Sequence, residues 1–115
     1  MEINEIVSLV LGKIVVGEAH KFDKIDRVFA SDLMSDVLTV INDKSLMLIT
    51  GLANLQTIRT CEMSDIKVIL FARGKVASEE MLELAKENDM VLIESKYSMY
   101  RISGILYQAG LQPVY

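Results

Sequence analysis

Several residue types are scarce in this sequence of 115 residues, and each scarcity excludes a class of site. Cys61 is the one cysteine, which rules out an internal disulfide and any zinc or iron–sulfur centre built from several thiolates. His20 is the one histidine, and without histidine or cysteine partners it cannot build a typical transition-metal site. We therefore expect no metal and no cofactor, and a reducing cytoplasm fits this cysteine usage.

Long hydrophobic runs and an excess of positive charge are also missing. No apolar run approaches the roughly 20 residues of a membrane-spanning helix, and the N-terminus lacks the basic and then apolar pattern of an export signal. The 16 acidic residues outnumber the 12 basic ones, giving a net charge of −4, which disfavours nucleic acid because phosphate binding depends on Lys and Arg. We expect a cytoplasmic protein without a membrane or nucleic-acid partner.

The standard motifs of nucleotide-using enzymes do not occur. Gly12-Lys13 and Gly74-Lys75 lack the upstream glycine and the following hydroxyl of a phosphate-binding P-loop, and there is no G-x-G-x-x-G fingerprint. Cys61 falls within an amphipathic segment, where core packing is the expected role of a free cysteine. We expect no catalytic residues, although an enzyme that uses Asp32, His20 or Cys61 as its reactive group stays open as an alternative.

The N-terminal part predicts a helix and then a strand. Residues 2–11 place apolar side chains on one helical face, and Gly12 follows at the position expected for a C-terminal cap. Residues 14–19 are largely β-branched and indicate a strand, although the glycine at 17 weakens it.

A second helix is predicted to begin near Ser31. This serine is the expected N-cap, and Asp32 would then lie in the first turn, where an acid interacts well with the helix dipole. The turn Asn42-Asp43-Lys44 is expected to end this helix.

From residue 46 onward, short apolar bursts alternate with helical periodicity. The pattern predicts strands at 46–50, 66–72 and 91–94, and helices over 54–63, after the cap Ser78, and from Met99 to the cap Gly110. Parallel strands need crossover connections, which helices of about ten residues supply. We therefore expect one α/β domain over residues 1–115, a three-layer α/β/α sandwich with a mainly parallel sheet.

Three loops of this expected sheet are candidates for ligand binding. In open α/β sheets, ligands bind outside the carboxyl ends of the strands, where helix N-termini favour anions. The candidate residues in and just after these loops are Thr50, Gly51, Asn54, Arg59, Arg73, Gly74, Lys75 and Ser95. Glycine and small polar residues are also what a β-to-α turn demands, and the turn alone is the favoured explanation for each loop taken by itself.

Four segments, SDLMSDVL, LMLITGLANLQTIRT, IKVILFARGK and ISGILYQAGL, occur in this order, and with them the chain resembles the DRTGG domain in its stand-alone form. The resemblance covers about residues 14–111. It implies an α/β/α sandwich similar to the N-terminal domain of HPr kinase/phosphorylase. It also implies a regulatory or dimer-forming role without catalysis, and relatives in anaerobes whose genes lie near iron-only hydrogenases.

The loops that give the resemblance its name are changed in this sequence. Thr50-Gly51 is kept, but Leu52-Ala53 stands where the resemblance implies Asp-Arg. Ala72-Arg73-Gly74 stands in place of Thr-Gly-Gly.

The sequence thus leaves two main functional hypotheses. The first is a regulatory or adaptor domain that forms a homodimer and senses a small anionic metabolite or nucleotide at the strand ends. The second is an accessory protein that binds a protein partner and helps to assemble a redox complex of the hydrogenase-linked kind.

Overall fold

In the computed structural model, which describes residues 1–19, 24–40 and 45–115, six strands form a sheet in the order β1-β5-β4-β3-β2-β6. The strands are β1 Lys13–Val16, β2 Arg27–Ala30, β3 Leu46–Thr50, β4 Val68–Phe71, β5 Val91–Glu94 and β6 Gln112–Pro113. The helices are α1 Ile3–Leu9, α2 Met34–Val37, α3 Leu55–Met63, α4 Glu79–Glu87 and α5 Met99–Gln108. His20 and the expected turn Asn42-Asp43-Lys44 lie outside the described residues.

The sheet is mainly parallel, as predicted. β6, β2, β3, β4 and β5 run parallel to their neighbours, and β1 pairs antiparallel with β5 at one edge. Each of the connections β3-α3-β4 and β4-α4-β5 is a parallel crossover through a helix.

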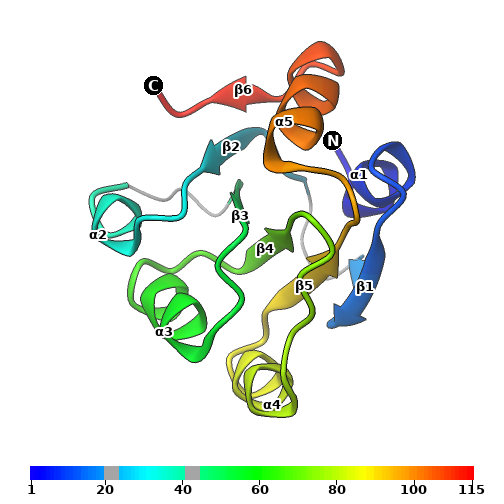
Figure 1. Cartoon of the computed structure of the whole chain (residues 1–115). Helices are drawn as coiled ribbons and strands as arrows, with labels where there is room; N and C mark the ends of the chain where they lie inside the picture. Colours follow the sequence, from blue (N-terminus) through cyan, green and yellow to red (C-terminus); the bar gives the residue numbers. More distant parts are fainter. Residues whose placement is uncertain (20–23, 41–44) are drawn as a thin grey trace.

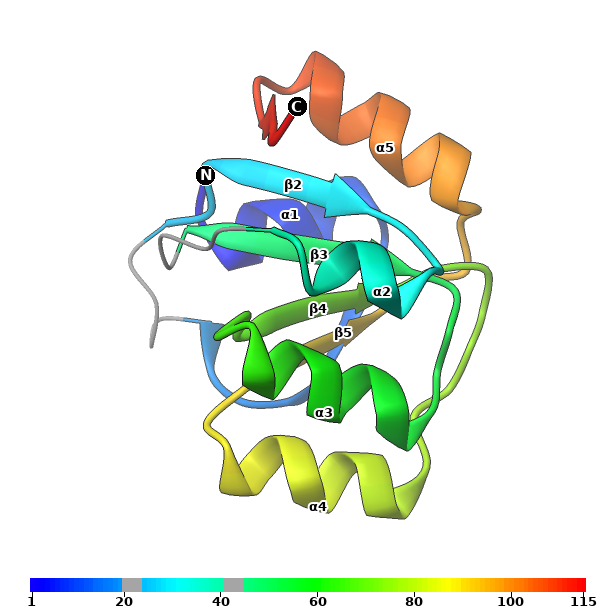
Figure 2. The same cartoon turned by 90° about the vertical axis from the view of Figure 1, so that its left-hand side faces the viewer.

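Helices cover both faces of this sheet (Figures 1 and 2). On one face α2, α3 and α4 pack on a core that includes Leu48 and Phe71, and on the other α1 and α5 pack on a core that includes Met47 and Ile49. Neighbouring residues of β3 therefore enter opposite cores, and all five of its residues are buried. This explains why the strands read as continuous apolar runs, and it confirms the expected α/β class.

The helices in the second half of the chain begin where the sequence predicts. Asn54, Ser78 and Ser98 each accept a hydrogen bond from a backbone N–H in the first turn of α3, α4 and α5 respectively. Gly110 follows α5 with a φ of 108°, a conformation that favours glycine. None of the helices in the described residues is long and apolar enough to cross a membrane.

The predicted second helix is wrong in its start. α2 has only four residues and begins at Met34, and its N-cap position is Leu33 rather than Ser31. The Ser31 hydroxyl oxygen instead accepts a hydrogen bond from the Leu33 N–H at 3.0 Å, a local turn that competes with helix. Asp32 is consequently not in a helical turn, and its carboxylate is available to the neighbouring strand.

The first helix also ends differently from the prediction. The residue in the left-handed conformation is Leu11, with a φ of 48°, and the Gly12 N–H donates to the Val7 carbonyl at 2.8 Å. Glycine at 12 serves packing instead, because a Cβ there would lie 3.0 Å from the Ile93 side chain. The strand expected over 14–19 is present but ends at Val16, before Gly17 turns the chain with a φ of 87°.

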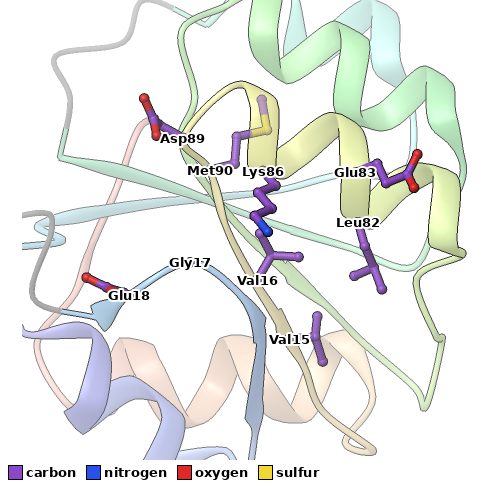
Figure 3. A pocket seen from close by; sticks show the side chains of 9 residues that line it. All are labelled: Val15, Val16, Gly17, Glu18, Leu82, Glu83, Lys86, Asp89 and Met90. Atoms are coloured by element: carbon purple, nitrogen blue, oxygen red, sulfur yellow. The ribbon is translucent and has the colours of Figure 1, made fainter.

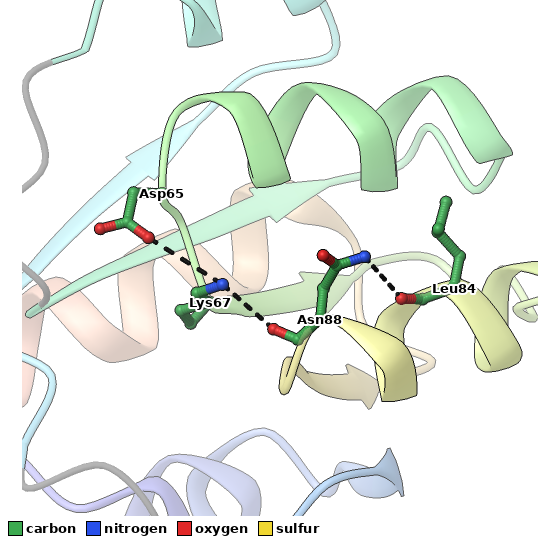
Figure 4. Close-up of polar contacts among 4 residues, drawn as sticks. All are labelled: Asp65, Lys67, Leu84 and Asn88. Atoms are coloured by element: carbon green, nitrogen blue, oxygen red, sulfur yellow. Dashed lines mark hydrogen bonds and ion pairs between the residues drawn. The ribbon is translucent and has the colours of Figure 1, made fainter.

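At the amino end of β4, Lys67 contacts the turn before β4 and the turn before β5 (Figure 4). Its Nζ donates to the Asn88 carbonyl at 3.0 Å and lies 3.9 Å from an Asp65 carboxylate oxygen. The Asn88 side-chain amide donates to the Leu84 carbonyl at 2.9 Å, near the end of α4. The amino-end turns before β4 and β5 are therefore held by polar contacts of their own.

Candidate functional site

The loops that follow β2, β3, β4 and β5 all lie at the carboxyl ends of these parallel strands (Figure 2). We call this end of the sheet the carboxyl edge; it comprises residues 31–33, 51–54, 72–78 and 95–98. Backbone hydrogen bonds continue past the strand ends. The Ala72 N–H donates to the Thr50 carbonyl at 2.9 Å, and the Ser95 N–H donates to the Phe71 carbonyl at 3.0 Å. The structure thus brings the three predicted loops to the same edge.

Thr50 and Gly51 are held by Asp32. The Asp32 carboxylate accepts hydrogen bonds from the Thr50 hydroxyl at 2.9 Å and from the Gly51 N–H at 2.6 Å. The Thr50 oxygen in turn accepts from the Leu52 N–H at 3.1 Å, and the threonine is fully buried. Sequence reasoning missed this role of Asp32, because it placed the residue in a helix.

The rest of the β3–α3 loop also serves local structure. The Asn54 side chain accepts from the Thr57 N–H at 2.9 Å, and the Thr57 hydroxyl donates to the Leu52 carbonyl at 2.6 Å. Leu52 and Ala53 pack against the core on the α2–α4 face. Two apolar residues therefore fill the place where the resemblance implies Asp-Arg.

Arg73, Gly74 and Lys75 form an exposed turn after β4. Arg73 and Gly74 both have positive φ, at 60° and 71°. The Arg73 N–H donates to the Tyr97 carbonyl at 2.7 Å and the Gly74 N–H to the Ser95 carbonyl at 2.9 Å, so this turn is tied to the loop after β5. Within residues 1–19, 24–40 and 45–115, no ion pair involves the side chain of Arg73 or Lys75.

Ser95 is a structural centre of the loop after β5. Its buried hydroxyl donates to the Val10 carbonyl at 2.8 Å, and its oxygen accepts from the Tyr97 N–H at 3.2 Å. The serine therefore joins the end of α1 to the carboxyl edge and has no hydrogen to offer a ligand.

Two further cations lie beside the Arg73 turn. Lys96 belongs to the same loop as Tyr97 and is exposed, and the Arg101 guanidinium lies 3.8 Å from the centre of the Tyr97 ring. Sequence reasoning missed Arg101. The available signal was its place three residues after the cap Ser98, in the first turn of a helix that begins at a strand end.

Arg59 stands apart from these residues. It lies in the second turn of α3 and is exposed, whereas its neighbours Ile58 and Thr60 are buried. At about 1.5 Å of rise per residue, it lies roughly 6 Å along the helix from Leu55. Arg59 is on the helix that Asn54 caps, and it is not part of the Arg73 turn.

Three hollows of the molecule lie away from these residues. The largest of these three, of about 620 Å³, is a groove between β1 and α4, and Val15, Val16, Leu82, Glu83 and Lys86 are among the residues that line it (Figure 3). The other two adjoin β2 with β6 and the segment around Ile25. None of these three hollows is lined by a residue of the candidate set.

Reactive groups are not assembled in the part of the chain that the structure describes. No three His, Cys, Asp or Glu side chains there could share a metal ion. Cys61 is fully buried in α3, as predicted, and this burial raises the pKa of its thiol from 9.0 to about 12. The thiol is therefore neutral at ordinary pH.

Comparison with known proteins gives a structural similarity. No family model matches the sequence, and no curated protein matches it either. The fold matches the crystal structure of the CBS and DRTGG domains of the regulatory region of Clostridium perfringens pyrophosphatase, complexed with the activator diadenosine tetraphosphate. The TM-score is 0.74 at 14% identity, over 94% of this chain and 46% of that one.

This similarity establishes the fold. The chain spans less than half of the length of the pyrophosphatase region, and the low identity carries no statement about its ligand. The fold expected from the resemblance to DRTGG domains is confirmed.

Proposed function

We propose that residues 1–115 form a single cytoplasmic regulatory domain without catalytic activity, which binds a small anionic metabolite or nucleotide at the carboxyl edge and works as a homodimer. The observation that carries the proposal is the Arg73 turn. Its two cations are exposed, without an ion pair in the described part of the chain, and the turn is fixed to the loop after β5 by two backbone hydrogen bonds.

The charges around this turn favour an anion. Arg73, Lys75, Lys96 and Arg101 come from two adjoining loops and the helix start that follows them, although acids outnumber bases in the whole chain. A guanidinium can bind a phosphate or carboxylate through two parallel hydrogen bonds, and a flanking ammonium adds a point charge. A phosphorylated metabolite or a nucleotide fits this set.

Backbone strain at the turn supports the same reading. Arg73 adopts a φ of 60°, which costs a non-glycine residue roughly 1–2 kcal/mol. Strained residues are concentrated at functional sites, where the side chain is worth its conformational cost. Leu11, Asp65 and Asp89 also have positive φ, so the strain at Arg73 counts only together with the exposed cations of its turn.

The structural neighbour supports a regulatory role. It is the regulatory region of a pyrophosphatase, and it was crystallised with a nucleotide activator. In our proposal this chain shares the regulatory role and the preference for a phosphate-bearing ligand, and not the activity of a pyrophosphatase.

The proposal that the domain is not an enzyme is supported by the state of two residues considered as reactive groups. The Cys61 thiol is buried and its pKa is raised to about 12, and the Asp32 carboxylate is occupied by the Thr50 hydroxyl and the Gly51 N–H. A thiol nucleophile needs a lowered pKa or a neighbouring base, whereas burial raises the pKa of Cys61.

A thermal-shift screen of nucleotides and acyl phosphates tests the ligand site. A ligand that binds only the folded state must raise the melting temperature, by the equivalent of about 2.7 kcal/mol at 100 times its dissociation constant. We expect a rise that Arg73→Ala abolishes and that Lys86→Ala preserves, because Lys86 lies on α4 near the opposite end of the strands. An equal response of both variants would refute this site.

The same screen separates the alternative hypothesis. An accessory protein of a redox complex would show no stabilisation by any of these compounds and would co-purify with the complex. That pair of results would replace the ligand-sensing proposal.

A further inference from the structure

The outer face of α5 carries two strongly exposed tyrosines. Tyr100 is 88% exposed and Tyr107 is 70% exposed. They are seven residues apart, which is nearly two helical turns, so they lie on the same face. Ser103 and Gly104 lie between them, and a Cβ added to Gly104 would meet nothing within 4 Å.

A groove lies beside the second of these tyrosines. It has a volume of about 300 Å³ and is bounded by α5, β2 and the C-terminal segment (Figure 1 shows these three elements side by side). Ser103 and Tyr107 line it from α5, and Phe29 and Tyr115 line it from the other side, with their rings edge-to-face at 6.1 Å. Most of the groove is apolar, and Tyr115 is itself 82% exposed.

We propose that this face binds a second copy of the chain, with two α5 helices antiparallel across a two-fold axis near Ser103 and Gly104. When a projecting side chain and a groove lie on the same face, on opposite sides of a point, a two-fold axis through that point places the side chain of each copy against the groove of the other. Tyr100 of the partner subunit then enters the groove beside Tyr107, and the reverse contact forms at the same time. This inference rests on the homodimer of the proposed function and assigns its interface.

The small residues between the tyrosines make this approach feasible. Gly104 has no side chain and Ser103 a short one, so the two helix backbones can cross closely at the axis. The single charge within α5, Arg101, stacks on Tyr97, so the axis itself brings no like charges together.

The area is sufficient for a specific contact. An aromatic side chain contributes about 150–250 Å² when it is buried. Burial of the exposed parts of Tyr100, Tyr107 and Tyr115 in both copies would remove on the order of 1,000 Å² from water before the groove walls are counted, and a specific interface needs about that much.

A charge exchange at position 104 tests the axis. Gly104→Glu and Gly104→Lys each place like charges next to one another across the two-fold axis, so we expect each variant alone to be a monomer of 12.9 kDa by light scattering at high micromolar concentration. Mixed in equal amounts, the two should form a heterodimer. Gln56→Glu, an exposed position on α3, should leave the dimer unchanged.

A second pair of variants tests the tyrosine. Tyr100→Ala should weaken the dimer by about 30-fold or more, as expected for a central aromatic anchor. Met63→Ala, which removes a 76% exposed side chain from α3, should have no such effect. The melting temperature of each variant at concentrations below dimerisation confirms that the fold is kept.

The outcomes distinguish the interface from the homodimer. If the Gly104 variants dimerise as the unsubstituted chain does, this interface is overturned and the homodimer stands. If the unsubstituted chain is a strict monomer, both the interface and the homodimer are overturned, while the anion response at Arg73 is tested independently.

Discussion

The Asp32 carboxylate accepts a hydrogen bond from the buried hydroxyl of Thr50, 2.9 Å away, and so joins the end of β2 to the end of β3. The same carboxylate oxygen accepts from the Gly51 N–H. This loop acid thereby organises the first loop of the carboxyl edge, whereas the sequence predicted that it would lie in the first turn of its own helix.

Replacing Asp32 should destabilise the domain. Asp32→Ala leaves the Thr50 hydroxyl and the Gly51 N–H without this partner, and the loss of hydrogen bonds to a charged group costs about 1.5–3 kcal/mol. Urea unfolding followed by circular dichroism measures the change. Asp36→Ala, at an exposed position of α2, should change the free energy of unfolding by less than about 0.5 kcal/mol. Equal effects of the two variants would contradict the role given to Asp32.

Arg73→Gly should stabilise the domain and at the same time remove its response to anions. Relief of the left-handed backbone gains roughly 1–2 kcal/mol, and the flexibility of glycine in the unfolded chain takes back about 0.5–1 kcal/mol, so a net gain of up to about 1.5 kcal/mol is expected. Leu11→Gly is the matched control, because Leu11 has a φ of 48° and is 72% exposed. It should show a similar gain and keep the anion response. A loss of stability in Arg73→Gly would show that the arginine side chain has a structural role.

Cys61 should make stability fall at high pH. Its pKa is raised from 9.0 to about 12 in the folded state, so between these values the folded state holds a proton that the unfolded state has lost. The thiol has no effect on the pH dependence below pH 9, and the free energy of unfolding should then decrease by up to about 1.4 kcal/mol per pH unit. Cys61→Ala should lack this component in urea titrations from pH 8 to 11, and the difference between the two curves isolates it from other titrating groups. Parallel curves would contradict it.

The central half of the fold could be predicted from the sequence because its signals agree with one another. Apolar runs, cap residues and helical periodicity coincide in β3-α3-β4-α4-β5, where both faces of each strand are buried and the caps Asn54 and Ser78 form as expected. The signals did not agree in this way for β2 and β6, on one side of the sheet. β2 has four residues, Arg27–Ala30, of which none is buried, and β6 has only two, both exposed.

The candidate residues were predicted by their position at strand ends, and the parallel sheet does gather them at one edge. Their chemical states could not be predicted, because these depend on partners far away in the chain. Ser95 donates to Val10, 85 residues away, and Thr50 donates to Asp32, 18 residues away. Arg101 and the exposed tyrosines of α5 were missed because they stand out only when the helix is placed on the sheet and its outer face is seen.

The sheet order has a consequence for synthesis on the ribosome. β1, close to the amino terminus, pairs with β5 near residue 91, and β2 gains its second neighbour only from β6 near residue 112. α1 likewise shares its core with α5. β1 therefore has no strand partner, and α1 lacks part of its core, until most of the domain has been synthesised.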